Sequence, residues 1–120
     1  MLDLLFVYGT LRSEFENEYA RLLRQHSERV GQATVRGSIY RLGDYPGFRL
    51  SPDGMVVGEL YRLHDPERTL ALLDAYEGEE FERITAGAHC NGKEVEAWIY
   101  GICLNPSAGA RIDPGDFCAA

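Results

Sequence analysis

The chain has 120 residues, enough for one compact domain with one core, so we expect a single domain over residues 1–120. Hydrophobic residues make up 45% and charged residues 26%, a composition that folds without disulfides or metal. The 19 acidic and 12 basic residues give a net charge of −7, which argues against nucleic-acid partners because these bind basic patches.

The N-terminal part predicts a buried strand and an amphipathic helix. Residues 4–8 form a continuous apolar run that ends at Gly9, which is typical of a buried strand. Over residues 14–29 the apolar residues recur with helical spacing. Ser13 is a suitable N-cap, and Glu16 three residues later would complete a capping box.

The middle of the chain predicts two further strands. Residues 30–42 combine β-branched and aromatic residues with Gly31 and Gly37, which indicates a long strand bent or bulged at glycine. We expect residues 43–47 to form a loop. The segment 55–63, MVVGELYRL, predicts another strand.

A second helix is marked by clear start and stop signals. Asp65 is a suitable N-cap, and Pro66 stands at the first helical position. Gly78 is well placed to end the helix as a left-handed C-cap residue.

The C-terminal part predicts a hairpin and an irregular tail. Residues 81–90 and 94–103 have the composition of two strands, and Asn91 and Gly92 between them favour a type I′ turn. Residues 105–120 are rich in proline and glycine and should be irregular. Two helices outside five or six strands with glycine bends indicate an α+β protein with a curled or barrel-like sheet.

The end of the first strand is the first candidate site. Tyr8, Gly9, Thr10 and Leu11 follow a buried strand, and backbone N–H groups at such a turn can bind a carboxylate or an oxyanion. The alternative interpretation is that Gly9 only permits the turn and that Thr10 makes a local hydrogen bond.

Glu77 is the second candidate. It falls at the C-terminal end of the predicted second helix, where the helix dipole disfavours a carboxylate. If it is turned inward, burial and neighbouring acidic residues would raise its pKa toward that of a general base near neutral pH. The alternative interpretation is a solvated residue at a helix end, since most charged residues are exposed.

Metal, membrane and secretory signals are weak. His89, Cys90 and Cys103 match no recognised zinc spacing, so we expect no metal. No apolar run approaches the ~20 residues of a membrane span, and we expect no membrane association. Three cysteines without a secretory signal pattern favour the cytoplasm.

Four motifs in order resemble the γ-glutamylcyclotransferase-like family, which includes the AIG2-like group. They are FVYGTL at residues 6–11, VRGSIYRLGDYPGF at 35–48, VVGELYRL at 56–63 and LDAYEG at 73–78. The resemblance covers most of the chain. It implies a small mixed β-barrel of five to six strands flanked by helices, which agrees with the α+β prediction from the residues.

The resemblance also implies a reaction. Members with known activity cyclise a γ-glutamyl group: its α-amine attacks the γ-carbonyl, which releases the attached amine or peptide and leaves 5-oxoproline. By this resemblance Glu77 is the catalytic general acid and base, and Tyr8, Gly9, Thr10 and Leu11 bind the substrate. We therefore expect an enzyme that acts on a small γ-glutamyl compound, with no metal and no organic cofactor. A monomer is expected because no sustained heptad pattern or exposed apolar helix face stands out.

Several alternatives stay open. Family members often have tyrosine a few residues beyond the catalytic glutamate, where this chain has Phe81. The chain could instead be a binding module that recognises a γ-glutamyl or other small carboxylate metabolite without turnover, or it could remove a γ-glutamyl group from a larger biosynthetic intermediate. Tyr40, Tyr45 and Tyr100 could line the pocket or fill the core. The segment IDPGDF at residues 112–117 resembles a family tail that packs near the site.

Overall fold

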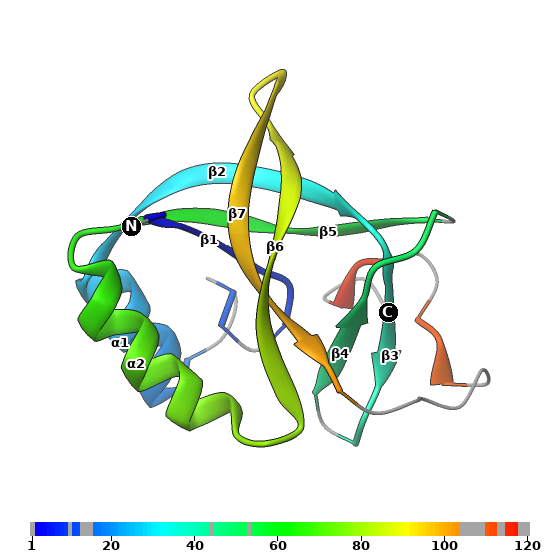
Figure 1. Ribbon diagram of the computed structural model, residues 1–120, viewed down its shortest axis with the longest axis horizontal. Coiled ribbons are helices and arrows are strands. Elements are labelled where there is room, and N and C mark those ends of the chain that lie inside the picture. The colour runs from blue at the N-terminus through cyan, green and yellow to red at the C-terminus, as the bar shows by residue number, and fades with distance from the viewer. Residues whose placement is uncertain are drawn as a thin grey trace.

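The computed structural model describes residues 2–9, 11–12, 16–43, 45–52, 54–103, 110–112 and 115–117. Within these residues the chain forms seven strands and two helices (Figure 1). In chain order they are β1 (Leu4–Val7), α1 (Glu18–Gln25), β2 (Ser27–Arg36), β3 (Ser38–Arg41), β4 (Pro46–Arg49), β5 (Met55–Leu63), α2 (Pro66–Glu77), β6 (Phe81–Cys90) and β7 (Lys93–Ile102).

Five of the strands close into a barrel. β1 pairs with β5, β5 with β2, β2 with β6 and β6 with β7, all antiparallel, and β7 returns to β1 in parallel at the pair Leu5 and Trp98. β4 continues the sheet beyond β7, again in parallel, and β3 forms its outer edge. The predicted α+β fold with a mixed barrel and flanking helices is confirmed, and two strands lie outside the closed barrel.

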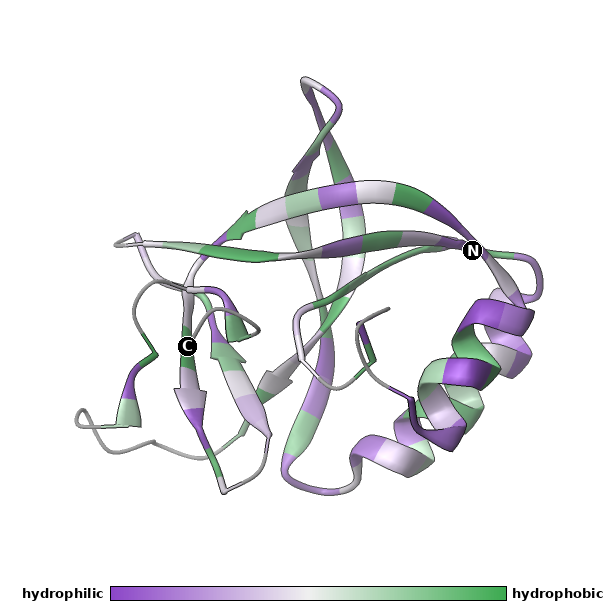
Figure 2. Ribbon diagram, turned by 180° about the vertical axis from the view of Figure 1, so that it is seen from behind, coloured by the Kyte–Doolittle hydropathy of each residue, from purple (hydrophilic) through white to green (hydrophobic). Residues whose placement is uncertain are grey.

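The barrel has apolar residues on two sides of β1. Leu4 and Phe6 belong to the cluster inside the barrel, with Ile99 from β7. Leu5 and Val7 face the other way, into a second cluster that includes Leu23 of α1 and Leu70 and Leu73 of α2. Because both of its faces are buried, β1 is a continuous apolar run, whereas hydrophobic and hydrophilic residues alternate along β2 and the β6–β7 hairpin (Figure 2).

The first helix is shorter than the sequence predicted. α1 begins at Glu18, with Asn17 as its N-cap, and residues 13–15, including Ser13, lie outside the described residues. Glu16 makes an ion pair with Arg24 at 2.9 Å, and its predicted capping box with Ser13 lies outside the described residues. At the other end, residues 27–29 pair with β5, so tertiary pairing overrides the helical spacing there.

The strands after α1 are bulged or interrupted at glycine residues. The sheet register shifts between Arg29 and Gly31, and the chain leaves β2 for β3 at Gly37, which confirms the predicted bulge and bend. The predicted loop at residues 43–47 was wrong in its second half, because Pro46 and Gly47 belong to β4 and pair with β3. Pro46 stands at the first position of β4, where its missing N–H is tolerated.

The second half of the chain matches the prediction closely. β5 and β6 have the expected bounds, β7 runs one residue earlier than expected, and Asp65 caps α2 by accepting a hydrogen bond from the Arg68 N–H at 3.4 Å. Gly78 ends α2 with φ of +77°, and Asn91 and Gly92 form the hairpin turn with φ of +54° and +78°. None of the helices in the described residues is long and apolar enough to cross a membrane.

The described parts of the C-terminal tail join the sheet at two places. The Ile112 N–H donates to the Ile39 carbonyl at 2.9 Å, and the Val57 N–H donates to the Gly115 carbonyl at 2.7 Å. These are isolated bridges, and residues 104–109, 113–114 and 118–120 lie outside the described residues.

Candidate active site

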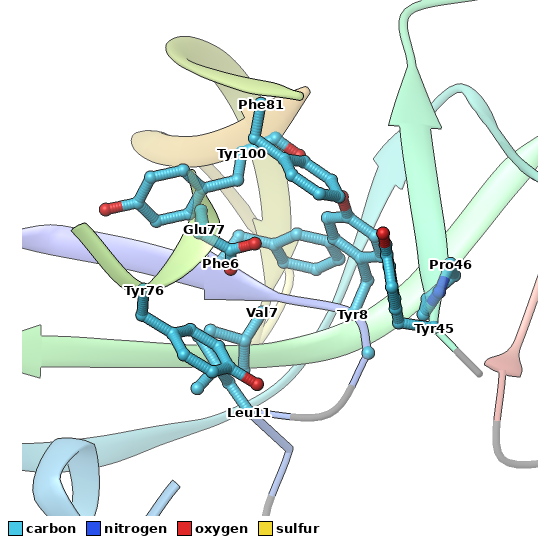
Figure 3. A pocket seen from close by; sticks show the side chains of 11 residues that line it. Phe6, Val7, Tyr8, Leu11, Tyr45, Pro46, Tyr76, Glu77, Phe81 and Tyr100 are labelled. Carbon is cyan, nitrogen blue, oxygen red and sulfur yellow. The ribbon is translucent and has the colours of Figure 1, made fainter. Parts of the chain in front are cut away.

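A pocket of about 200 Å³ lies where β1 ends, beside the C-terminal end of α2 (Figure 3). Its walls come from the start of the chain, the β3–β4 connection, the end of α2, and the facing parts of β6 and β7. It is lined by Phe6, Val7, Tyr8, Gly9, Leu11, Tyr45, Pro46, Tyr76, Glu77, Phe81 and Tyr100. Glu77 is the one acidic or basic side chain among these lining residues.

Glu77 is the last residue of α2, and its carboxyl group points into this pocket (Figure 3). Among the described residues, none hydrogen-bonds to this carboxyl group or pairs with it. Burial, with a further contribution from the negative charge of Asp74, raises the pKa of Glu77 from 4.5 to about 7. A carboxyl group that titrates near neutral pH can both accept a proton and return it.

The backbone turns sharply after β1, at Gly9. The Arg12 N–H donates to the Gly9 carbonyl at 3.1 Å, which closes the turn. A Cβ atom at Gly9 would lie 2.8 Å from Cγ of Pro46, so only glycine permits this close packing. Gly9 and Leu11 both line the pocket, while Thr10 lies outside the described residues.

A buried arginine ties this turn to the C-terminal tail. The side chain of Arg12 is only 7% exposed, and its Nη1 lies 2.7 Å from Oδ1 of Asp116. The same nitrogen lies 3.5 Å from the Val57 carbonyl on β5. The turn is therefore held from two other parts of the chain.

Tyr8 contributes its ring to the pocket, but its hydroxyl group is used inside the fold. This hydroxyl donates to the Tyr100 carbonyl at 2.5 Å and accepts a hydrogen bond from the Phe48 N–H at 3.1 Å. It thereby joins β7 and β4 at the back of the pocket. Burial, with the charge of Glu77 adding to it, raises the pKa of Tyr8 well above its ordinary value, so the phenol stays neutral.

Aromatic side chains form most of the rest of the wall. The Tyr76 ring stacks on Tyr19 of α1, with ring centroids 4.2 Å apart. The Tyr45 and Phe81 rings lie 6.0 Å apart, and the Tyr45 hydroxyl donates to Oε2 of Glu80 at 2.9 Å. This last bond links the β3–β4 connection to the turn that follows α2.

Four of the predicted site residues therefore meet in one pocket. Tyr8, Gly9 and Leu11 at the end of β1 and Glu77, more than sixty positions later, all line it. Of the three tyrosines left open, Tyr45 and Tyr100 line the pocket and Tyr40 does not.

Sequence reasoning missed the other wall residues. Phe6 and Val7 were assigned to the predicted buried strand, and Tyr76 lies in the predicted second helix; only the tertiary structure brings the end of β1 and the end of α2 to one cavity. Pro46 was assigned to a loop, although it lies in the segment that resembled the family motif. Across the described ranges, no three His, Cys, Asp or Glu side chains gather closely enough to hold a metal ion.

Comparison with known proteins identifies the family. The model of the family "Gamma-glutamyl cyclotransferase, AIG2-like" matches residues 5–119. This match covers nearly the whole chain, including the barrel and the pocket glutamate. The chain therefore belongs to the γ-glutamyl cyclotransferase, AIG2-like family.

Individual relatives agree with this assignment. A protein of Methanocaldococcus jannaschii that is provisionally named a γ-glutamylcyclotransferase is 27% identical over 121 residues, which cover 97% of this chain and 96% of that protein. The crystal structure of YkqA from Bacillus subtilis is similar with a TM-score of 0.79 and 30% identity over 98% of this chain, which spans 40% of the YkqA chain. An AIG2-like protein of Mus musculus has the same fold, with a TM-score of 0.72, 22% identity, and coverage of 91% of this chain and 82% of that chain.

Proposed function

We propose that the chain is a γ-glutamyl cyclotransferase that converts a γ-glutamyl amine or another small γ-glutamyl compound into 5-oxoproline and a free amine. The observation that supports this most strongly is Glu77: a partly buried carboxyl group with a pKa of about 7, directed into a pocket otherwise lined by uncharged residues. Membership of the family supports the class of reaction.

The reaction begins with a proton transfer to Glu77. The α-ammonium group of a γ-glutamyl substrate is not nucleophilic, so the carboxylate takes one of its protons and leaves a neutral amine. The amine nitrogen then attacks the γ-carbonyl carbon, forming the new C–N bond of the five-membered ring and a tetrahedral oxyanion.

The second half of the reaction returns this proton. The bond from the γ-carbon to the leaving nitrogen breaks as Glu77 protonates that nitrogen. The ring nitrogen still carries a second proton, which Glu77, now a carboxylate again, takes up and passes to the leaving amine. The substrate ammonium thus gives up two protons and the leaving nitrogen takes up two, so the amine leaves as an ammonium ion and neither a net proton nor an electron is consumed. A carboxyl group with a pKa near 7 is suited to both transfers, since its two protonation states are similar in free energy at neutral pH.

The turn after β1 would hold the glutamyl group. In this proposal the backbone N–H groups of Gly9, Thr10 and Leu11 donate hydrogen bonds to the substrate α-carboxylate or to the oxyanion. The proposal is supported by Gly9 and Leu11, which line the same pocket as Glu77. Holding the amine and the γ-carbonyl in one small cavity favours the near-attack geometry for ring closure. At about 200 Å³ the cavity is below the ~300–1,000 Å³ of sites that enclose a drug-sized ligand, so the leaving amine would extend out of it.

We also propose that the enzyme acts as a monomer in the cytoplasm. The thiols of Cys90 and Cys103 are free, which is compatible with a reducing compartment. The partner is the small γ-glutamyl substrate, with no cofactor.

The test is a panel of γ-glutamyl amines and γ-glutamyl peptides, each assayed for 5-oxoproline release and for binding by calorimetry. We expect at least one compound to be turned over far faster than its uncatalysed cyclisation. If a compound binds and none is turned over, the chain is a binding module, and Phe81, which lacks a hydroxyl group at the pocket wall, is the first residue to replace with tyrosine. If none binds or reacts, the proposed function is wrong.

A further inference from the structure

A second carboxylate, Asp74, stands one turn before Glu77 on α2. Residues three positions apart are neighbours on a helix surface. The Asp74 side chain is 43% exposed and does not line the pocket. Its two oxygens nevertheless contact side chains from two different strands.

These contacts fix the position of the Asp74 carboxylate. The Tyr100 hydroxyl on β7 donates to Oδ1 at 2.7 Å. On β6, Nε and Nη2 of Arg83 lie 3.0 Å from Oδ1 and 3.3 Å from Oδ2. The guanidinium group in turn lies over the Trp98 ring, 4.4 Å from its centroid. The end of α2 is thereby attached to the β6–β7 hairpin through Asp74.

Tyr100 connects this cluster to the pocket. Its side chain lines the pocket, while its hydroxyl proton is committed to Asp74. A tyrosine hydroxyl has one proton to donate. As long as Asp74 accepts it, that proton is not available to stabilise the Glu77 carboxylate.

Asp74 is the charged group that contributes to the raised pKa of Glu77. The phenols of Tyr8 and Tyr100 have raised pKa values and are neutral at neutral pH, as is that of Tyr45. Arg83 is engaged with Asp74, and Glu80 at the following turn accepts from Tyr45. The titratable or charged groups that face this end of α2 come from every neighbouring element: Tyr8 after β1, Tyr19 of α1, Tyr45 before β4, Glu80 after α2, Arg83 of β6 and Tyr100 of β7.

We propose that Asp74 is a positioning residue of this site: held by Tyr100 and Arg83 one helical turn before Glu77, it keeps a negative charge beside that carboxyl group, and it orients the Tyr100 ring in the pocket wall. Asp74 acts through Glu77 and Tyr100 and does not touch the substrate. Its part in turnover rests on the proposed cyclotransferase function, whereas its effect on the titration of Glu77 does not.

The test is direct titration of Glu77 by ¹³C NMR of labelled glutamate side chains, in the wild type and in Asp74→Asn. The amide still offers Tyr100 an oxygen acceptor but removes the charge, so the pKa of Glu77 should fall by about half a unit to one unit. Asp74→Glu keeps the charge and should leave the pKa of Glu77 near the wild-type value. Asp74→Ser is a second neutral variant should the asparagine chain fail to fold.

Glu67→Gln is the matched control. It removes the same charge from the exposed first turn of α2, ten positions away, which is about 15 Å along the helix. This exceeds the Debye length of ~8 Å at physiological ionic strength, so Glu77 should titrate as in the wild type.

Kinetic measurements distinguish the effect of Asp74 on the Tyr100 ring from its effect on Glu77. With an active substrate, the low-pH limb of kcat/KM should move to lower pH in Asp74→Asn by the same amount as the NMR titration. Tyr100→Phe keeps the charge of Asp74 and loses only the hydrogen bond, so KM should rise while that limb does not move to lower pH.

The two hypotheses fail in different ways. If Glu77 titrates at the same pH in the wild type and in the neutral Asp74 variants, the role of Asp74 is refuted, even if the enzyme is active. If the variants shift the titration but no γ-glutamyl compound is turned over by the wild type, the proposed function falls and the coupling between Asp74 and Glu77 stands.

Discussion

The proton affinity of Glu77 has a consequence for stability that requires no substrate. In the folded chain its pKa is about 7, whereas the unfolded chain would have the ordinary value of 4.5. The folded state therefore binds this proton more tightly than the unfolded state does. The folded chain is favoured while Glu77 is protonated, and this advantage is lost as the pH rises from about 4.5 through 7.

Replacing Glu77 with glutamine removes this loss of stability at high pH, because glutamine does not titrate. A pKa difference of about 2.5, at 1.36 kcal/mol for each unit, corresponds to an upper limit of about 3 kcal/mol above pH 8. At pH 5 the same relation leaves less than about 1 kcal/mol. We therefore expect Glu77→Gln to be more stable than the wild type at pH 8, with an advantage about 2–3 kcal/mol larger than at pH 5.

The assay is urea unfolding of both chains at pH 5 and pH 8, followed by circular dichroism. The control is Glu96→Gln, the same substitution at an exposed position of β7, which should show no comparable gain at pH 8. If the stability difference between Glu77→Gln and the wild type is the same at both pH values, Glu77 is not a carboxylate with a raised pKa, and the argument for its role as a base is refuted.

Three further predictions concern the pocket wall and the reaction. Gly9→Ala places a Cβ atom 2.8 Å from Pro46 and should raise KM for the best substrate roughly 10-fold or more, measured by initial rates; an unchanged KM would remove the turn from the binding site. Tyr8→Phe leaves two buried backbone groups without their partner and should lower the free energy of unfolding by about 2–4 kcal/mol in urea, with no dependence on pH between 5 and 8. In the wild type, kcat/KM should rise with pH through about 7 as Glu77 loses its proton, and a flat profile from pH 5 to 8 would contradict the proposed base.

Much of the fold could be predicted because local signals were strong and agreed with the tertiary structure. Asp65 and Pro66 mark the start of α2, and Asn91 and Gly92 mark the hairpin turn, and the structure uses them in these roles. At the N-terminal helix the local signal was misleading. Residues 27–29 continue the helical spacing, yet the hydrogen bonds of β5 draw them into β2, and such pairing over a long sequence separation leaves no local signal.

The site could be predicted only in part, for a related physical reason. Glu77 stood out because a carboxylate at the C-terminal end of a helix is electrostatically unfavourable. Gly9 stood out because glycine follows a buried strand, although the contact with Pro46 that requires it became visible only in the structure. Asp74 was expected only as one of several acidic residues near Glu77, since its hydrogen bonds depend on Tyr100 and Arg83, which reach it from the β6–β7 hairpin.

The most direct test of the central claim is the rate of 5-oxoproline release from the best γ-glutamyl substrate at pH 8, in wild type and Glu77→Gln. We predict that the substitution lowers kcat at least 100-fold, as expected for loss of a general acid and base, while the substrate still binds in calorimetry. Turnover by Glu77→Gln within a few-fold of the wild type would contradict the assignment of Glu77 and the mechanism built on it.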